Sequence, residues 1–423
     1  MRYCTRCVYP ETHPHLLTFD EQGVCSGCRV HEEKDSLNWE ERFKILKQIA
    51  EKYRNKDGSN YDCIVPVCGG KDSFFITHVV TKVLGLNPLL VTFNEEYNTK
   101  KGIRNLANLI TKFDCDHIQY TVDPMLIKKI AKVTMRKSGD MYWHCVAGTS
   151  VFPVQAAVKF DIPLIIWGVH PLSDSVGMFS HLDMVEMSKK VRQEHIMRTR
   201  DYKDLIGEEG ITEKELAPFI YPSDEELERV GVRGIYLSNF IRWDSQKQHE
   251  DMINMYGYES GVQERTFNTY ENVHCLHCDG VHDYIKFLKY GFGRATEHTC
   301  RDIRLKRMTR EEAIELTEKY DYKVPRDLKI FLEGIGMSEK EFYECIDKFR
   351  DPRAWEKVNG EWQLKDPIRN HINDKDVDDV RLERIEERKY IRTVSPESDE
   401  PDDRTYLMGR TYIDKRNFRA VTD

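Results

Sequence analysis

Apolar positions follow two different spacings along the chain, and the two spacings alternate. Short runs rich in β-branched residues, the pattern of buried strands, cover residues 62–67, 88–93, 117–122, 163–168 and 232–240. Segments with the apolar spacing of amphipathic helices lie between them, at 73–83, 98–113, 124–137 and 149–160. Strands that alternate with helices predict an α/β fold, a doubly wound parallel sheet with helices on both faces.

Helical spacing also dominates both sides of this region. Residues 37–55 predict an amphipathic helix ahead of the first strand, and residues 309–350 predict helices with capping signals. We therefore expect a mainly helical C-terminal part. Beyond Asp351 the sequence is strongly polar, with a predicted charged helix at 374–392.

The turn between the first predicted strand and its helix reads Cys-Gly-Gly-Lys-Asp-Ser, residues 68–73. Two glycines at such a turn allow backbone torsions that other residues rarely adopt, so several N–H groups can point at one spot. This spot lies at the N-terminus of the helix, where the helix dipole is positive. That is an anion site, which phosphate usually occupies. Lys71 can neutralise phosphate oxygens, Asp72 can cap the helix or hold Mg²⁺ through water, and Ser73 adds a hydroxyl. The alternative, a plain βα turn, is weaker once the whole string is considered.

In parallel sheets, ligands bind beyond the carboxyl ends of the strands. The residues in these positions are Asn94, Glu95, Glu96, Asp123 and 168–170. Residues 144–150 fit either a second anion-binding turn or an ordinary helix start. Residues 173–180 have the composition of a loop that could act as a lid.

Two Cys-x-x-Cys pairs, Cys4/Cys7 and Cys25/Cys28, lie near the N-terminus. Each pair supplies two thiolates, and together they complete a tetrahedron around Zn²⁺. Residues 1–36 are too few to build a core, so a metal ion would hold them together. A closed four-cysteine site has no open coordination position, which makes it structural rather than catalytic.

A second cysteine-containing stretch spans residues 271–305. By ligand count, Cys275, Cys278 and Cys300 predict a possible second metal site, either zinc or, less favoured, an iron–sulfur cluster. In the same stretch, a tight turn presents Arg294, and Arg294 and Arg301 are candidates for contacts to a carboxylate or phosphate of a substrate.

Composition limits the function classes. The chain has 423 residues and a net charge of −8, enough length for two or three domains and an acidic balance that makes nucleic-acid binding unlikely. No apolar run approaches the roughly 20 residues that span a bilayer, and the first residues lack an apolar signal core. We therefore expect a cytoplasmic protein without membrane insertion, whose twelve cysteines are thiols and metal ligands.

The turn at 68–73 resembles the SGGxDS loop of the PP-loop ATP pyrophosphatases, which split ATP between the α and β phosphates and adenylate an oxygen of the substrate. The spacing of a Walker loop is absent. Cys68 stands where these enzymes usually have serine, so a hydroxyl is lost although the backbone N–H remains.

Three features together resemble the bacterial N-acetyl sugar amidotransferases of lipopolysaccharide O-antigen and nonulosonic acid biosynthesis. They are the N-terminal cysteine module, the 68–73 loop, and the stretch HDYIKF…KYGFGRAT…RDIR…MTREEAIEL that begins at His282. The resemblance covers about residues 1–350 and implies a PP-loop, HUP-like fold. The expected regions are a zinc-binding module at 1–36, an ATP-pyrophosphatase domain at 37–200, a helical substrate or partner region at 201–350 and a charged tail at 351–423.

The resemblance also implies a reaction, in which an acetamido group of a nucleotide-activated sugar becomes an acetamidino group. Its cofactors would be ATP, Mg²⁺ and Zn²⁺. The implied roles are pyrophosphate binding by Cys68, Gly69, Gly70 and Ser73, charge neutralisation by Lys71, and Mg²⁺ or loop orientation by Asp72. Asn94 and Gly168 would lie near adenosine, and Arg294, Arg301 and His282 near the sugar nucleotide. For the general base, Glu95, Glu96 and His170 remain open.

The chain shows no glutaminase motif around a nucleophilic cysteine. The resemblance therefore implies ammonia from a separate glutaminase subunit, with or without a HisF-like cyclase-type partner. Two other functions remain open: a PP-loop tRNA-modifying enzyme of the thiolating or lysidine type, and a non-catalytic zinc- and nucleotide-binding subunit.

Overall fold

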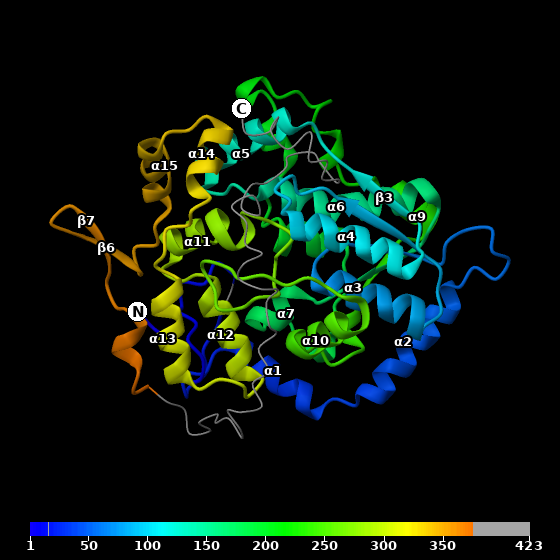
Figure 1. Cartoon of the computed structure of the whole chain (residues 1–423), viewed down its shortest axis with the longest axis horizontal. Helices are drawn as coiled ribbons and strands as arrows, with labels where there is room; N and C mark the ends of the chain where they lie inside the picture. Colours follow the sequence, from blue (N-terminus) through cyan, green and yellow to red (C-terminus); the bar gives the residue numbers. More distant parts are fainter. Residues whose placement is uncertain (16, 375–423) are drawn as a thin grey trace.

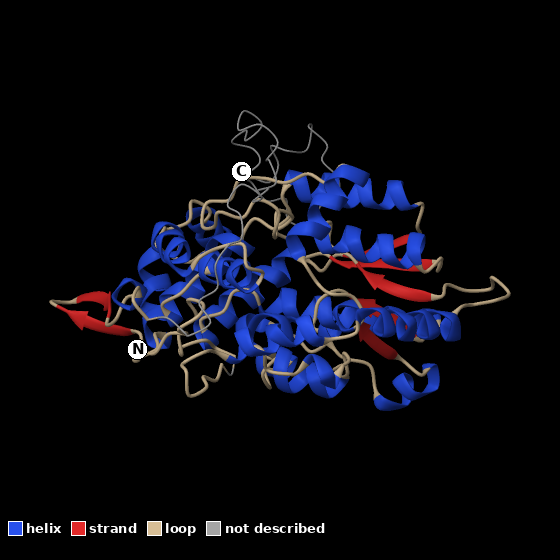
Figure 2. Ribbon diagram, turned by 90° about the horizontal axis from the view of Figure 1, so that it is seen from below, coloured by secondary structure: helices blue, strands red, loops and turns tan. Residues whose placement is uncertain are grey.

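The computed structural model describes residues 1–15 and 17–374, and a parallel sheet forms its centre (Figures 1 and 2). Five strands pair in the order β3-β2-β1-β4-β5. Their bounds are β1 Cys63–Pro66, β2 Pro88–Phe93, β3 His117–Tyr120, β4 Leu164–Trp167 and β5 Arg233–Tyr236. The predicted doubly wound α/β fold is confirmed, and the strand order changes direction between β1 and β4, where such sheets bind ligands.

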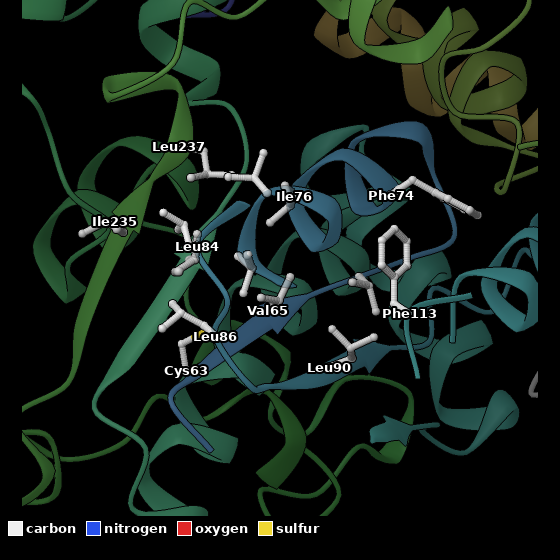
Figure 3. Packing of buried hydrophobic residues seen from close by; sticks show 14 of the residues in the cluster. Cys63, Val65, Phe74, Ile76, Leu84, Leu86, Leu90, Phe113, Ile235 and Leu237 are labelled. Carbon is white, nitrogen blue, oxygen red and sulfur yellow. The ribbon is translucent and has the colours of Figure 1, made fainter. Parts of the chain in front are cut away.

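Helices cover both faces of the sheet (Figure 2). They are α2 Trp39–Tyr53, α3 Lys71–His78, α4 Lys100–Phe113, α5 Pro124–Ser138, α6 Trp143–Phe160, α9 Asp224–Val230 and α10 Ser245–Tyr256. Because side chains alternate along a strand, Val65 packs toward Phe74 of α3, as Figure 3 shows, whereas Ile64 joins Ala157 of α6 in a different cluster. The strands are therefore apolar on both faces.

The α6 helix begins six residues earlier than the apolar pattern predicts, at Trp143 rather than at residue 149. Residues 144–150 therefore lie inside the helix, and the prediction of an anion-binding turn there is wrong. Gly148 faces the ring of Phe93, and a Cβ at this glycine would lie 2.2 Å from ring carbons. The small residues of this stretch thus allow α6 to approach β2.

The N-terminal module packs on the C-terminal helices rather than standing alone. Its helix is α1 Ser26–Ser36, and its core contains Tyr9 and Val24. The same buried cluster includes Phe292 and Ile303, more than 250 positions along the chain. Figure 1 shows the N-terminal segment in blue behind α12 and α13. The predicted lid region begins with a short helix, α7 Pro171–Val176, whose Val176 joins this cluster.

The C-terminal part is helical, as predicted. It contains α11 Asp283–Tyr290, α12 Arg294–Arg304, α13 Arg310–Tyr320, α14 Leu328–Ile335 and α15 Glu339–Ile346. The predicted tail starts with a hairpin of β6 Trp355–Val358 and β7 Glu361–Leu364, which projects from the body in Figure 2. A short helix, η10 Ile368–His371, follows the hairpin. Residues 375–423, with nearly all of the predicted 374–392 helix, lie outside the described residues. In the described part, no helix is both long and apolar enough to cross a membrane.

The α13 helix begins with the predicted capping box. The Thr309 side chain accepts a hydrogen bond from the Glu312 N–H, and the Glu312 carboxylate accepts one from the Thr309 N–H at 2.9 Å. Thr309→Ala should lower the free energy of unfolding by about 1 kcal/mol. The Glu312 N–H would lose its acceptor, and the Glu312 carboxylate that accepts from the N–H of residue 309 would be held less firmly. Thr309→Ser should retain most of that stability. Urea denaturation of the three proteins checks this, and equal losses for both variants would show that the threonine methyl, not the cap, is responsible.

Candidate active site between the sheet and the C-terminal helices

The 68–73 loop joins β1 to α3 at the carboxyl edge of the sheet. Gly69 has φ +75°, and a Cβ there would lie 2.7 Å from the carbonyl oxygen of Gly102, so both torsion and space require glycine. The Ser73 hydroxyl accepts a hydrogen bond from the Cys68 N–H at 3.0 Å and thereby braces the loop. Gly70 is the N-cap residue of α3 and has no side chain that could accept hydrogen bonds from the first N–H groups of the helix. The start of α3 can therefore bind an anion.

Lys71 connects this loop to the C-terminal part of the chain. Its Nζ lies 2.5 Å from Asp72 Oδ1 and 3.4 Å from Glu271 Oε1, and Glu271 also pairs with Arg301. Burial alone would lower the pKa of Lys71, but the carboxylates of Asp72 and Glu271 raise it above its usual value. Burial would raise the pKa of Glu271, but Lys71 and Arg301 hold it well below the usual range. Lys71 and Glu271 are therefore both charged at neutral pH.

Glu271 is a member of the site that sequence reasoning did not identify. It is 9% exposed and lies 200 positions from Lys71 in the chain. The only signal was its position next to the Cys275-x-x-Cys278 stretch. Its pairing with Lys71 depends on tertiary contact that apolar spacing does not encode.

The residues after β2 form the wall of a small cavity of about 20 Å³, which Cys68, Asn94, Glu95 and His274 line. The Asn94 side chain accepts a hydrogen bond from the Glu96 N–H at 3.0 Å and fixes the backbone after the strand. Glu95 accepts a hydrogen bond from the Tyr142 hydroxyl at 2.6 Å. Asn94 and Glu95 thus lie beside the loop, as predicted for strand-end residues.

A second cavity, of about 230 Å³, lies on the other side of Tyr142, between the N-terminal module and α11–α12. Its cationic lining residues are Arg198, Arg200, Lys286, Lys289 and Arg294. Acidic groups offset part of this charge, since Arg294 pairs with Asp279 and Glu297 at 2.7 Å each. His282 also lines the cavity, with its ring 4.5 Å from that of Tyr142, and burial lowers its pKa to about 4.

Other predicted residues lie elsewhere. Gly168 is packed against α3, where a Cβ would lie 2.8 Å from Ile76 Cδ1. His170 caps α7 by accepting a hydrogen bond from the Ser173 N–H at 3.1 Å, and burial lowers its pKa to about 4. Neither residue lines the cavities beside the 68–73 loop or Tyr142.

The predicted second metal site is not formed. Cys275 and Cys278 pack in a cluster with α11 and α14, whereas Cys300 lies in the core of the N-terminal module. Cys4, Cys7, Cys25 and Cys28 have their sulfur atoms within 4.8 Å of one another. Within the described residues, this is the one group of three or more His, Cys, Asp or Glu side chains that lie close enough to share a metal ion. The prediction rested on the number of cysteines in the stretch, which does not show that Cys300, in α12, lies in a different cluster from Cys275 and Cys278.

The four N-terminal thiols are buried and suitably arranged for a metal ion. Cys7 Sγ and Cys25 Sγ are 3.6 Å apart, close to the roughly 3.8 Å that tetrahedral zinc with 2.3 Å bonds requires. The Cys7 and Cys25 N–H groups both donate to Cys4 Sγ, at 3.3 and 3.2 Å. Such bonds fix ligand orientation, so the donor set fits a structural Zn²⁺ site.

Comparison with known proteins adds a family match for the C-terminal part. Residues 264–369 match the family model described as "LPS biosynthesis protein WbpG-like, C-terminal domain". An uncharacterized protein of Methanocaldococcus jannaschii, MJ1599, is 29% identical over 129 residues, which are 30% of this chain and 42% of that protein. The match therefore spans less than half of that relative.

Two solved structures align at low similarity. An NMN synthetase from Francisella tularensis aligns with a TM-score of 0.27 and 12% identity, over 54% of this chain and 98% of that chain. An NH3-dependent NAD synthetase from Campylobacter jejuni aligns with a TM-score of 0.26 and 10% identity, over 46% of this chain and 92% of that one.

Proposed function

We propose that the chain is an ATP-dependent amidotransferase acting on a nucleotide-activated sugar. It would convert an acetamido group into an acetamidino group for a surface polysaccharide or a nonulosonic acid. The match of residues 264–369 to the WbpG-like C-terminal domain of lipopolysaccharide biosynthesis supports this proposal. The observation that supports this most directly is the Lys71–Glu271–Arg301 network. It joins the phosphate-binding loop to the domain that the family model matches.

The proposed reaction has two steps. The acetamido oxygen attacks the α-phosphorus of ATP, and pyrophosphate leaves. Ammonia then adds to the activated carbon, and AMP leaves with the former acetamido oxygen. Both steps develop negative charge on phosphate oxygens, so the protein must mainly supply positive charge and exclude water.

Residues of the loop meet these requirements. The free N–H groups at the start of α3 and the Lys71 ammonium would bind the pyrophosphate, while Asp72 would orient Mg²⁺ or the loop. Glu271 would hold Lys71 in place, because a lysine side chain that is 4% exposed needs a counter-charge when no nucleotide is present. Asn94 would lie near the adenosine.

The basic cavity is the proposed site for the phosphates of the sugar nucleotide. Arg198, Lys289 and Arg294 line it, and charge-assisted hydrogen bonds are the strong contacts to phosphate. Tyr142 connects the two cavities, with its hydroxyl on Glu95 and its ring against His282. An acetamido group could reach the nucleotide if the Tyr142 side chain moved.

The remaining parts follow from the same proposal. Zn²⁺ would be held by the four N-terminal cysteines and would stabilise the module without taking part in the chemistry. Ammonia would come from a separate glutaminase subunit, with or without a HisF-like cyclase-type partner. We place the protein in the cytoplasm, where sugar nucleotides and ATP are available.

The test is incubation of the zinc-loaded protein with ATP, Mg²⁺, an ammonium salt and candidate UDP- or CMP-activated N-acetyl sugars. We expect AMP and pyrophosphate, together with a lighter sugar nucleotide in which NH has replaced oxygen. Isotopically labelled ammonium should enter that product, as mass spectrometry can show. AMP formation that depends on added tRNA and not on any sugar nucleotide would instead favour the tRNA-modifying alternative.

Arg198→Ala tests the basic cavity. Its guanidinium donates a hydrogen bond to the Pro14 carbonyl at 3.3 Å, so its loss should disturb the fold little. We expect KM for the sugar nucleotide to rise about tenfold, the effect of losing one charged hydrogen bond, with KM for ATP unchanged. Arg229→Ala, at an exposed pair with Asp161, is the matched control. An equal rise in KM for ATP would place Arg198 in the ATP site instead.

A further inference from the structure

A cysteine, a histidine and a carboxylate meet at the phosphate-binding loop. The Cys68 thiol and the His274 imidazole lie against each other beside Gly70, where a Cβ would be 3.4 Å from Cys68 Sγ and 3.1 Å from His274 Nδ1. On the far side of the imidazole, Nε2 lies 4.0 Å from Glu95 Oε1. His274 Nδ1 has no hydrogen-bond partner in the described part of the chain. The imidazole can therefore direct a proton toward the loop.

The groups that face Cys68 come from several elements. His274 approaches from the loop before α11, Glu95 from the end of β2, Ser73 from α3 and Tyr258 from the segment after α10. Ser73 Oγ is 3.6 Å from the thiol. Burial would raise the pKa of Cys68, but His274 lowers it below its usual value. Burial would lower the pKa of His274, but Cys68 and Glu95 raise it to about 9.

We propose that Cys68 is a reactive thiol, activated by His274, at which small hydroperoxides form a sulfenic acid. The thiolate sulfur attacks one peroxide oxygen, an S–O bond forms and the O–O bond breaks. The sulfur loses two electrons and the peroxide gains them. The hydroxide or alkoxide that leaves takes its proton from the His274 imidazolium. Glu95 orients and stabilises that imidazolium, in the manner of other cysteine–histidine pairs.

The size of the cavity restricts the reagent. Its volume of about 20 Å³ is little more than the space of one water molecule. Hydrogen peroxide is of similar size, whereas bulky aromatic disulfides are not. Cys68 should therefore react with hydrogen peroxide and only slowly with such disulfides. An added oxygen would lie beside the N–H groups that bind phosphate.

The experiment uses the full-length, zinc-loaded protein without nucleotide, so its result does not depend on the proposed amidotransferase activity. The protein is treated with hydrogen peroxide at pH values from 5 to 9, and catalase removes the peroxide at set times. Because dimedone is too large for the cavity, the protein is then unfolded in the presence of dimedone, and labelling of each cysteine peptide is measured by mass spectrometry. Cys115 is the internal reference, because it is also half-buried and burial raises its pKa to about 11. We expect Cys68 to be labelled at least about a hundredfold faster than Cys115 at pH 7.

The pH dependence and a variant complete the test. The rate at Cys68 should rise less steeply with pH than the rate at Cys115, because His274 lowers the pKa of Cys68 below its usual value. The rate at an ordinary thiol rises almost tenfold per pH unit at pH values below its pKa of about 8.5. His274→Gln should slow labelling of Cys68 about tenfold at pH 7 and restore the steep pH dependence. If that variant unfolds, buried Cys63 is labelled too, and the wild-type profile alone decides. A steep wild-type profile, or equal rates at Cys68 and Cys115, would overturn the proposal.

Discussion

Lys71→Ala is expected to reduce ATP-dependent formation of AMP and pyrophosphate by about a hundredfold to a thousandfold. Lys71 is the first residue of α3, whose N-cap Gly70 makes no side-chain hydrogen bond. Removal of one preorganised donor to a developing charge typically has an effect of this size. The loss should appear in kcat as well as in KM for ATP, because the ammonium would contact the leaving pyrophosphate. Pyrophosphate release measured with saturating sugar nucleotide checks this, and Lys44→Ala, an exposed lysine of α2, is the control.

The partner carboxylate separates a direct role of Lys71 from a general loss of structure. Lys71→Ala leaves the buried Glu271 with Arg301 as its remaining pair, so the protein should also be less stable. In Lys71→Ala/Glu271→Gln the surplus negative charge is gone, and part of the lost stability should recover while activity stays low. Recovery should be incomplete, because Arg301 then lacks the Glu271 carboxylate. Recovery of activity together with stability would show that Lys71 acts only through folding. No product above background from either protein, with Lys71→Ala indistinguishable from wild type, would support the non-catalytic alternative.

The parts of this fold that local sequence decides were predictable. The strand–turn–helix around residues 68–73 combines a β-branched run, two glycines and a polar helix start, and each of these acts within a few residues. β2 was predicted with the bounds that the structure shows, because Pro88 begins the apolar run and polar residues follow Phe93. The cysteine pairs of the N-terminal module were recognisable for the same reason, since each pair is local.

The parts that depend on contacts between distant segments were not predictable. Lys71 with Glu271 and Cys300 with the N-terminal core are such contacts. The early start of α6 is another, since Gly148 and its neighbours lack the apolar spacing of a helix but fit closely against Phe93. When a site lies between a sheet edge and a second helical region, a single sequence therefore predicts only the residues on one side of it. The half with the proposed phosphate-binding loop follows a local motif, and the half proposed to face the substrate does not.

Removal of the Zn²⁺ ion proposed for the N-terminal module is expected to have the largest effect on stability. Structural zinc contributes apparent binding free energies of about 10–16 kcal/mol at neutral pH, and this energy is coupled to folding. Val176 of α7, Phe292 and Ile303 share the buried cluster of the four cysteines, so unfolding of the module would expose them. We expect Cys25→Ser, or chelation of the metal, to lower Tm by about 10 °C or more. The usual scale is about 2–4 °C per kcal/mol for 150–250 residues, and the shift per kcal/mol is smaller for a chain of 423 residues. Hydrogen exchange should rise in α12 and α13 while β1 and β2 stay protected.

Cys300→Ser is the control that separates ligation from packing. Cys300 is fully buried in the same cluster but is absent from the four-thiol group. This variant should keep one zinc ion per chain, measured by elemental analysis, and lose only the stability that burial of a hydroxyl costs. Cys25→Ser should lose both the metal and the protection of α12. If Cys300→Ser lost its zinc as well, Cys300 would be a ligand, and the module would not be the closed four-cysteine site that its N–H···S bonds indicate. If Cys25→Ser kept full protection of α12 without metal, the apolar cluster would suffice to hold the module, because burial of side chains such as Tyr9 and Phe292 would then outweigh the loss of the thiolate ligands.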